Sequence, residues 1–216
     1  MLSSHHAKTH SHSSKLVGAL RKHPLVLREV LIPGMFLLAI LISNYSLANV
    51  PNVKLFDLFI FAAGYSLGIR RGVTIACGAW MIYGNFNPWG PTTGLLLITV
   101  MASETIYAFA GSFVRQLCAP DQIRLKSASL LPMFSTAAII STLMYDIVTN
   151  VYTGFEWALM TGNLTALGSI LIALTNPGAI FFSSVHIASN VVAFILVGPL
   201  VIKATERLSK LPDQDG

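Results

Sequence analysis

Charged residues are scarce in this sequence. Asp, Glu, Lys and Arg make up 11% of its 216 residues, whereas hydrophobic residues make up 54% and the mean hydropathy is +0.67. A soluble domain of ordinary composition has about 25% charged residues. The composition therefore excludes such a domain and predicts a polytopic membrane protein, in which one helical bundle takes up nearly the whole chain.

Motifs for nucleotide hydrolysis and paired cysteines are absent as well. No stretch fits the G-x₄-G-K-[ST] pattern, so the chain does not hydrolyse ATP through a site of that type. Cys77 and Cys118 occur singly, without the spacing of a disulfide or metal pair. We predict a protein that is not an enzyme and has no cofactor and no metal site.

Apolar stretches of membrane-spanning length follow one another along the chain. A transmembrane helix needs about 20 apolar residues. We place six spans, at 31–48, 54–69, 71–86, 93–115, 127–149 and 178–203. With these spans, 13 of the 14 Lys and Arg residues fall on one side, and only Lys54 falls on the other.

This distribution of charge predicts the topology. The formal net charge of +5 could indicate a nucleic-acid partner, but basic residues that gather on one side of a set of spans mark the cytoplasmic face of a membrane protein. We therefore predict an all-α membrane protein with six transmembrane helices in one compact bundle and both termini in the cytoplasm. It is expected to be a multi-pass protein of the cell membrane, in contact with the lipid bilayer and without a nucleic-acid partner.

Residues 164–175 are apolar but are not counted among the six predicted spans. The segment is short for a span, and Asn176-Pro177-Gly178 interrupts the chain after it. A seventh span would also move the C-terminal basic residues to the other side. We predict a short interfacial or re-entrant helix on the outer side, before the last span.

The two ends of the chain differ from the rest in composition. Residues 1–24 are rich in Ser and His and are predicted to be a disordered basic tail, and residues 211–216 form a second polar tail. No Cys or acid in the first tail completes a metal site with its histidines, which are His5, His6, His10 and His12. The transmembrane domain is therefore expected over 25–210.

Small residues recur every four positions in the first three predicted spans. Ala39 and Ser43 lie on one face of the first span, and Gly64 and Gly68 on one face of the second. Such spacing lets helix backbones approach closely in lipid. Two interpretations stay open here, namely packing within the bundle and a docking surface for another membrane protein.

Ionisable side chains inside the spans are the strongest functional signal, because each is costly in hydrocarbon. We identify Glu104, Asp146 and His186 as such residues. At about 1.5 Å per residue, Asp146 lies roughly 5 Å below the outer boundary, His186 roughly 10 Å, and both Glu104 and Asn190 roughly 16 Å. The inner half of the bundle has no such groups, so we predict a pocket that opens outward and is closed below.

Polar and aromatic residues near the outer boundary complete the predicted pocket. Tyr107 shares a helix face with Glu104, and Asn190 shares one with His186. The predicted upper wall consists of residues from the loop GNFNPWGPTT (84–93), from the end of the fifth span and from the loop after that span. These residues are Asn85, Asn87, Trp89, Tyr145, Asn150 and Trp157.

Structural roles for the same residues also stay open. Trp89 could be an interfacial anchor, and Asp146 could cap the outer loop. His186 and Asn190 could simply form hydrogen bonds between helices.

Four stretches, in this order, resemble S components, the substrate-binding subunits of energy-coupling factor (ECF) vitamin transporters. They are GIRRG (68–72), NPWGPTTGLLL (87–97), YDIVTN (145–150) and FFSSVHIASNVVAFILVGPLVIKATER (181–207). The resemblance implies six helices and a vitamin or related micronutrient bound between the last three helices and the outer loops. It also implies docking through small residues of the first helix onto a transmembrane coupling subunit that two ABC-type ATPases drive. Ser43 departs from this pattern, since the family has a second Ala there.

Two other functions are considered. An intramembrane serine hydrolase would need Ser112 beside His186, but by helix rise Ser112 lies roughly 29 Å below the outer boundary and His186 roughly 10 Å. A stand-alone secondary transporter or channel could use Glu104 as a proton relay, but no two halves of the sequence look like repeats. We predict the substrate-capture subunit of an ATP-driven micronutrient importer.

Overall fold

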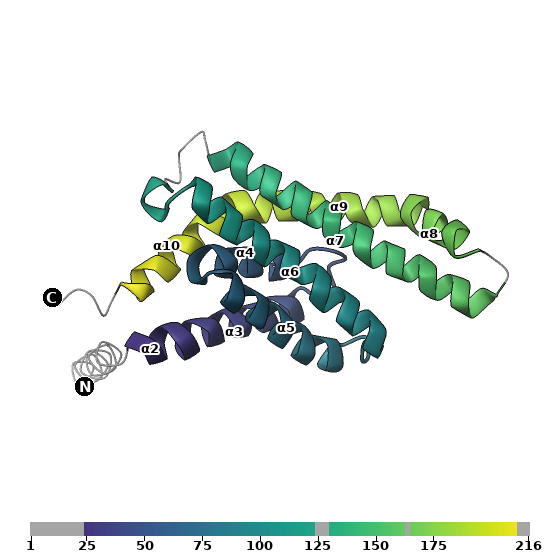
Figure 1. The fold of residues 1–216 in the computed structure, drawn as a ribbon, viewed down its shortest axis with the longest axis horizontal. Helices are drawn as coiled ribbons and strands as arrows, with labels where there is room; N and C mark the ends of the chain where they lie inside the picture. Colours follow the sequence, from purple (N-terminus) through teal and green to yellow (C-terminus); the bar gives the residue numbers. More distant parts are fainter. Residues whose placement is uncertain (1–23, 124–129, 163–164, 211–216) are drawn as a thin grey trace, which may run out of the picture.

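The computed structural model describes residues 24–123, 130–162 and 165–210, so the predicted tails, including the four histidines of the first, lie outside the described residues except for Pro24. The described chain is all-helical and contains no strand (Figure 1). Its elements in order are α2 (Pro24–Val26), a π-helical turn η1 (Leu27–Leu31), α3 (Ile32–Ser46), α4 (Phe56–Leu67), α5 (Ile69–Phe86), α6 (Gly94–Leu117), a 3₁₀ turn η2 (Pro120–Gln122), α7 (Leu130–Thr161), α8 (Ala166–Thr175), α9 (Pro177–Leu196) and α10 (Gly198–Ser209).

Within residues 24–123, 130–162 and 165–210, four helical segments are long and apolar enough to cross a membrane. They are Leu27–Ser46, Gly94–Leu117, Leu130–Thr161 and Pro177–Leu196. Their outer faces expose large hydrophobic side chains such as Leu38, Phe113 and Leu196, as expected for surfaces that contact lipid. The helices therefore fit a multi-pass membrane protein, as the composition predicts.

The second predicted span is much shorter than expected. Helix α4 has 12 residues and is enclosed by the other helices, with Phe56, Asp57 and Leu58 at its start already buried. It ends at Gly68, whose φ of +88° is a backbone conformation that favours glycine. The chain then turns directly into α5. The apolar sequence alone does not reveal that this helix is short and enclosed by its neighbours.

Glycines hold α4 and α6 in close contact. A Cβ atom added to Gly64 would lie 2.2 Å from the backbone oxygen of Ala108, and one added to Gly111 would lie 2.0 Å from that of Phe61. Gly64 is therefore part of the packing inside the bundle, which favours the first of the two interpretations left open for it. Gly68 belongs to the turn between α4 and α5, whereas Ala39 and Ser43 are half-buried on α3.

The beginning and end of the described chain lie together. The Arg28 Nη2 atom donates a hydrogen bond to the backbone oxygen of Ser209 at 3.0 Å, which joins η1 to the end of α10. Figure 1 shows α2 and the end of α10 at the same end of the bundle. An ion pair between Arg71 and Glu29 also ties the start of α5 to η1.

Helix α7 continues well past the predicted end of the fifth span. It runs for 32 residues to Thr161, so the segment after YDIVTN that was expected to be a loop is helical. Gly154, the first glycine or proline in this part of the chain, does not break the helix, because it lies against the backbone of Ile170 on α8. The helix ends only at Gly162, whose φ is +63°.

Helix α8 is found where a short helix is predicted, but it continues the line of α9. Asn176 separates the two helices, and its side-chain oxygen caps α9 by accepting a hydrogen bond from the backbone N–H of Ala179. Figure 1 shows α8 and α9 running antiparallel to α7, with α8 and the end of α7 projecting beyond the other helices. The predicted sixth span, 178–203, is itself divided into α9 and α10 around Pro199.

Candidate functional site

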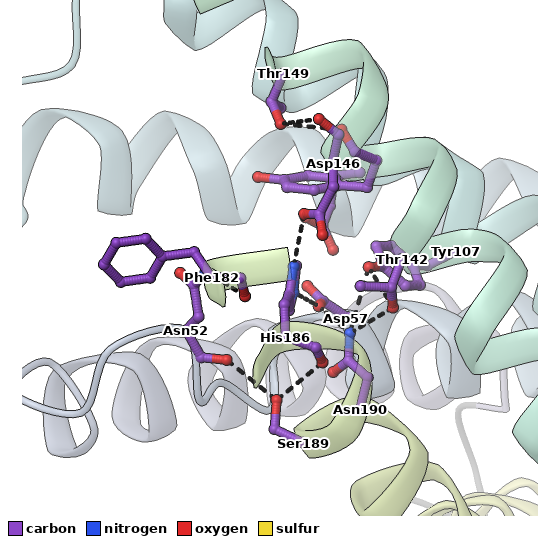
Figure 2. Close-up of polar contacts among 12 residues, drawn as sticks. Asn52, Asp57, Tyr107, Thr142, Asp146, Thr149, Phe182, His186, Ser189 and Asn190 are labelled. Atoms are coloured by element: carbon purple, nitrogen blue, oxygen red, sulfur yellow. Dashed lines mark hydrogen bonds and ion pairs between the residues drawn. The ribbon is translucent and has the colours of Figure 1, made fainter. Parts of the chain in front are cut away.

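His186, in the middle of α9, bridges two carboxylates from different helices. Its Nδ1 atom lies 2.8 Å from Oδ1 of Asp146 on α7, and its Nε2 atom lies 2.7 Å from Oδ2 of Asp57 on α4. All three side chains are buried (Figure 2). Because carboxylates only accept hydrogen bonds, both contacts are hydrogen bonds when His186 is an imidazolium or when one carboxyl is protonated. The pairs Asp57–His186 and His186–Asp146 are called the ion bridge below.

Asn190 extends this network one helical turn further along α9. Its Nδ2 atom donates to Asp57 Oδ2 at 2.6 Å and to Thr142 Oγ1 at 2.8 Å, and lies 3.4 Å from the Tyr107 hydroxyl. The Tyr107 hydroxyl in turn donates to Thr142 Oγ1 at 3.1 Å. Side chains from α4, α6, α7 and α9 are therefore joined in one buried polar cluster.

Glu104 of α6 also belongs to this buried cluster, next to Asp57. Its Oε2 atom accepts a hydrogen bond from Trp80 Nε1 at 3.1 Å, and its carboxyl is an electrostatic neighbour of Asp57. The Oε1 atom of Glu104 is buried and has no hydrogen-bond partner. The Trp80 indole N–H is therefore the donor for Glu104 Oε2.

Trp80→Phe is expected to lower the free energy of unfolding by about 1–3 kcal/mol, because it removes the N–H group that donates to Oε2 of the buried Glu104 carboxyl. Unfolding of the purified variant in detergent measures the loss. The double variant Trp80→Phe/Glu104→Leu is the control, since it removes the carboxyl that needs the donor. A double variant as unstable as the single one would show that the loss comes from the tryptophan ring alone.

A cavity of about 220 Å³ lies against the ion bridge. Asp57, Asp146 and His186 form its polar side, together with Asn150 of α7. Its aromatic side chains are Phe56, Trp80, Tyr145 and Phe182. The Tyr145 ring meets the imidazole of His186 edge-on, with 5.7 Å between ring centroids.

A larger hollow of about 480 Å³ adjoins this cavity and shares Asn52, Lys54, Trp80 and Phe182 with it. Lys54 is at the boundary between the two spaces. Its Nζ atom lies 6.0 Å from the ring centroid of Trp80 and 5.6 Å from that of Tyr83, within the range of cation–π contacts.

The connection between α3 and α4 is fixed over the cavity by α9. Asn52 Nδ2 donates to the backbone oxygen of Phe182 at 3.0 Å, and the Ser189 hydroxyl donates to the backbone oxygen of Asn52 at 3.1 Å (Figure 2). Asn52 has a φ of +51°, which asparagine tolerates better than most residues do. The wall that carries Lys54 is therefore held in place by hydrogen bonds.

Most of the predicted pocket residues lie together in the structure. The buried cluster contains Glu104, Tyr107, Asp146, His186 and Asn190, while Tyr145 and Asn150 line the cavity and Asn87 and Trp89 line the adjoining hollow. His186 and Asn190 of α9 also form hydrogen bonds to side chains of α7, as the structural alternative for these two residues predicts.

Two predicted pocket residues lie elsewhere. The amide of Asn85 is exposed and donates to the backbone oxygen of Met81 in its own helix. Trp157 is 41% exposed and lies three turns beyond Asp146, on the projecting end of α7. Both were expected in a loop wall, and α7 instead continues as a helix that carries Trp157 away from the cavity. For the same reason, Asp146 lies inside a helix and does not cap a loop.

Sequence reasoning missed Asp57, which is central to the ion bridge. Asp57 lies three residues inside the predicted span 54–69, where the rule that identified Glu104 and His186 applies equally. Trp80 and Thr142 were also missed, and no sequence signal marks them, since they join the cluster only through tertiary packing.

Comparisons of the chain with protein-family models, with curated proteins and with solved structures gave no match. The contacts of the buried cluster and the lining of the cavity therefore carry the functional conclusion.

Proposed function

We propose that this protein captures a small micronutrient at the cavity beside the ion bridge and acts as the substrate-binding subunit of an ATP-driven importer. A transmembrane coupling subunit and two ABC-type ATPases would supply the energy. The observation that carries the proposal is an aromatic-lined cavity that ends on buried, hydrogen-bonded charged groups within a bundle of apolar helices. Cavities of this kind, with few but well-placed polar groups, are typical ligand sites.

The proposed topology has six crossings, in which α4 and α5 are the second and third and α9 with α10 is the last. Arg28, Arg115 and Lys210 lie around one hollow at the end of the bundle where the described chain begins and ends. The positive-inside rule supports a cytoplasmic location for this end. The cavity would then open toward the outside.

An apolar barrier lies between the buried cluster and the basic end. Phe61 follows Asp57 by one turn on α4, and Phe194 follows Asn190 by one turn on α9. Their ring centroids are 4.7 Å apart, and the ring of Phe134 packs against Phe61 at 5.5 Å. This barrier favours a cup closed on one side over an open channel.

Two of the motifs that resemble S components lie at the cavity. YDIVTN (145–150) contributes Tyr145, Asp146, Thr149 and Asn150 to its lining, and the stretch 181–207 contributes Phe182 and His186. This placement supports the resemblance. Docking to the coupling subunit is proposed through α3, where Ala39 and Ser43 lie beside the exposed side chains of Met35, Leu38 and Ile42.

The contacts of His186 argue against a hydrolase. Both ring nitrogens face carboxylates, so neither is left to activate a serine. Ser112 lines a different, apolar hollow between α6 and α7, together with Phe109 and Phe113.

A second candidate function is a proton-coupled transporter that works alone, and one observation favours it. Glu104 has a buried oxygen without a partner, beside the ion bridge, where a proton could be held. The apolar barrier toward the basic end speaks against it. Uptake driven by a pH gradient in liposomes that contain only this chain would favour this function.

Uptake assays with partners test the main proposal. Cells or liposomes that contain this chain, a coupling subunit and two ATPases are expected to accumulate the small molecule that is released from the purified protein and identified by mass spectrometry. Uptake that continues when both ATPases are inactivated would refute the proposal.

Two aromatic residues on α7 test the location of the site. Tyr145→Ala should weaken binding of the released compound about tenfold or more, a loss of about 1.4 kcal/mol, because Tyr145 lines the cavity. Trp157→Ala on the same helix should bind normally, because Trp157 lies outside the cavity. Titration calorimetry with the purified variants measures both. Equal losses in the two variants would contradict the assigned site.

A further inference from the structure

A separate hollow of about 230 Å³ lies at the basic end of the bundle and shares no lining residue with the cavity beside the ion bridge. Residues of η1, α4, α6, η2 and α10 surround it. Its charged side chains are those of Arg28, Arg115, Lys210 and one acid, Glu206. This space is called the basic hollow below. Because several elements surround it, a bound group would contact more than one basic side chain at once.

Arg115 brings an unpaired positive charge to the basic hollow. Lys210 pairs with Glu206, since its Nζ atom lies 3.3 Å from Oε1 of that acid. Within the described part of the chain, no acid forms an ion pair with Arg115. An anion would therefore meet Arg115 without displacing an existing ion pair.

The Arg115 guanidinium is positioned by a ring but keeps its donors. Its Cζ atom lies 5.4 Å from the ring centroid of Tyr65, within the range of cation–π contacts. The Tyr65 hydroxyl donates to the backbone oxygen of Cys118 at 2.6 Å, so this ring is itself held in place. The Arg115 side chain is exposed, and contact with a ring face leaves its N–H groups accessible to an acceptor.

The surroundings of the basic hollow favour a lipid over a free ion. Leu25 and Leu31, three residues on either side of Arg28, are exposed, so apolar surface begins next to the hollow. A planar guanidinium can donate two parallel hydrogen bonds to a phosphate. Basic pockets between transmembrane helices on the cytoplasmic side are typical sites for the head groups of anionic lipids.

We infer that the basic hollow binds the phosphate group of an anionic phospholipid, with Arg115 as its main donor and with Arg28 and Lys210 beside it. The inference is independent of substrate capture. It rests on the proposed topology only for the choice of the cytoplasmic leaflet, and the experiment below does not depend on that choice.

Native mass spectrometry with defined lipids provides the test. The full-length protein, stripped of lipid in detergent, is mixed with equal amounts of phosphatidylglycerol and phosphatidylcholine that have the same acyl chains. The wild-type protein is expected to retain one phosphatidylglycerol, with a preference of about tenfold over phosphatidylcholine. An excess of inorganic phosphate should not displace it, because the phosphate ion lacks the apolar contacts of the acyl chains.

Three single-charge variants are expected to differ in sign. Arg115→Gln should reduce the preference to about twofold or less. Glu206→Gln should increase it, because this variant removes the acid of the lining and releases Lys210 from its ion pair. Arg70→Gln is the matched control, since Arg70 lies at the start of α5 outside the lining, and it should behave as the wild type. Thermal unfolding without lipid shows whether each variant is folded.

Several outcomes would overturn the inference. Equal retention of both lipids by the wild type, or equal losses in Arg115→Gln and Arg70→Gln, would show that the hollow does not select an anionic lipid. Displacement by inorganic phosphate would assign the hollow to a free anion. If Arg115→Gln lowered co-purification of a coupling subunit and left lipid retention unchanged, the hollow would belong to that partner. Small-molecule capture is tested separately by Tyr145→Ala, so it stands or falls independently.

Discussion

Replacement of His186 by alanine is expected to lower the free energy of unfolding by about 3–5 kcal/mol. Asp57 and Asp146 would lose their shared partner while they remain buried, and removal of one member of a buried ion pair leaves an uncompensated charge. Reversible unfolding of the purified protein in mixed detergent micelles measures the difference.

The control for this prediction also removes the charge of Asp57, which has lost its partner His186. In His186→Ala/Asp57→Asn, one of the two carboxylates becomes a neutral amide, which still accepts a hydrogen bond from Asn190. The loss in the free energy of unfolding of the double variant should therefore be smaller than the summed losses of the two single variants, by at least about 1 kcal/mol. A loss in His186→Ala below about 1 kcal/mol, the value for an exposed pair, would show that the bridge is not a buried ion pair.

Gly111→Ala is expected to destabilise the bundle by about 3 kcal/mol. The added Cβ would lie 2.0 Å from the backbone oxygen of Phe61, so α4 and α6 must move apart. Because α4 carries Asp57 and α6 carries Glu104, the shift would also disturb the buried cluster. Gly64→Ala, whose Cβ would meet the Ala108 oxygen, should behave in the same way. Thermal unfolding and the yield of folded protein measure the effect.

Gly78→Ala is the matched control. Gly78 also lies within a helix, α5, but apart from the backbone of its own helix no atom lies within 4 Å of a Cβ built there. Alanine has a higher helix propensity than glycine by about 1 kcal/mol, so this variant should be unchanged or slightly more stable. Equal destabilisation by Gly78→Ala and Gly111→Ala would show that close contact between α4 and α6 is not the cause.

The sequence predicts the class of fold well, because composition and long apolar runs report directly on helices in lipid. It predicts the lengths of helices poorly. The end of α7 was placed at 149, although the segment up to Gly162 contains no residue that must end a helix. Whether an apolar helix such as α4 faces lipid or is enclosed by other helices depends on its neighbours, and hydropathy carries no information about them.

The site was partly predictable for a related reason. Glu104 and His186 stand out because ionisable residues in apolar runs need partners, and the structure places both in one cluster. Asp57 obeys the same rule and was missed because it lies close to the predicted start of its span. Thr142 and Trp80 become part of the site only when α5 and α7 pack beside α6, so no sequence pattern marks them.

Native mass spectrometry of the purified protein tests small-molecule capture most directly. The wild-type chain, released from detergent after exposure to yeast extract, is expected to carry one small molecule. The adduct should be absent from Tyr145→Ala and present in Trp157→Ala. A wild-type spectrum without any adduct, or an adduct equally abundant in both variants, would contradict a ligand site beside His186.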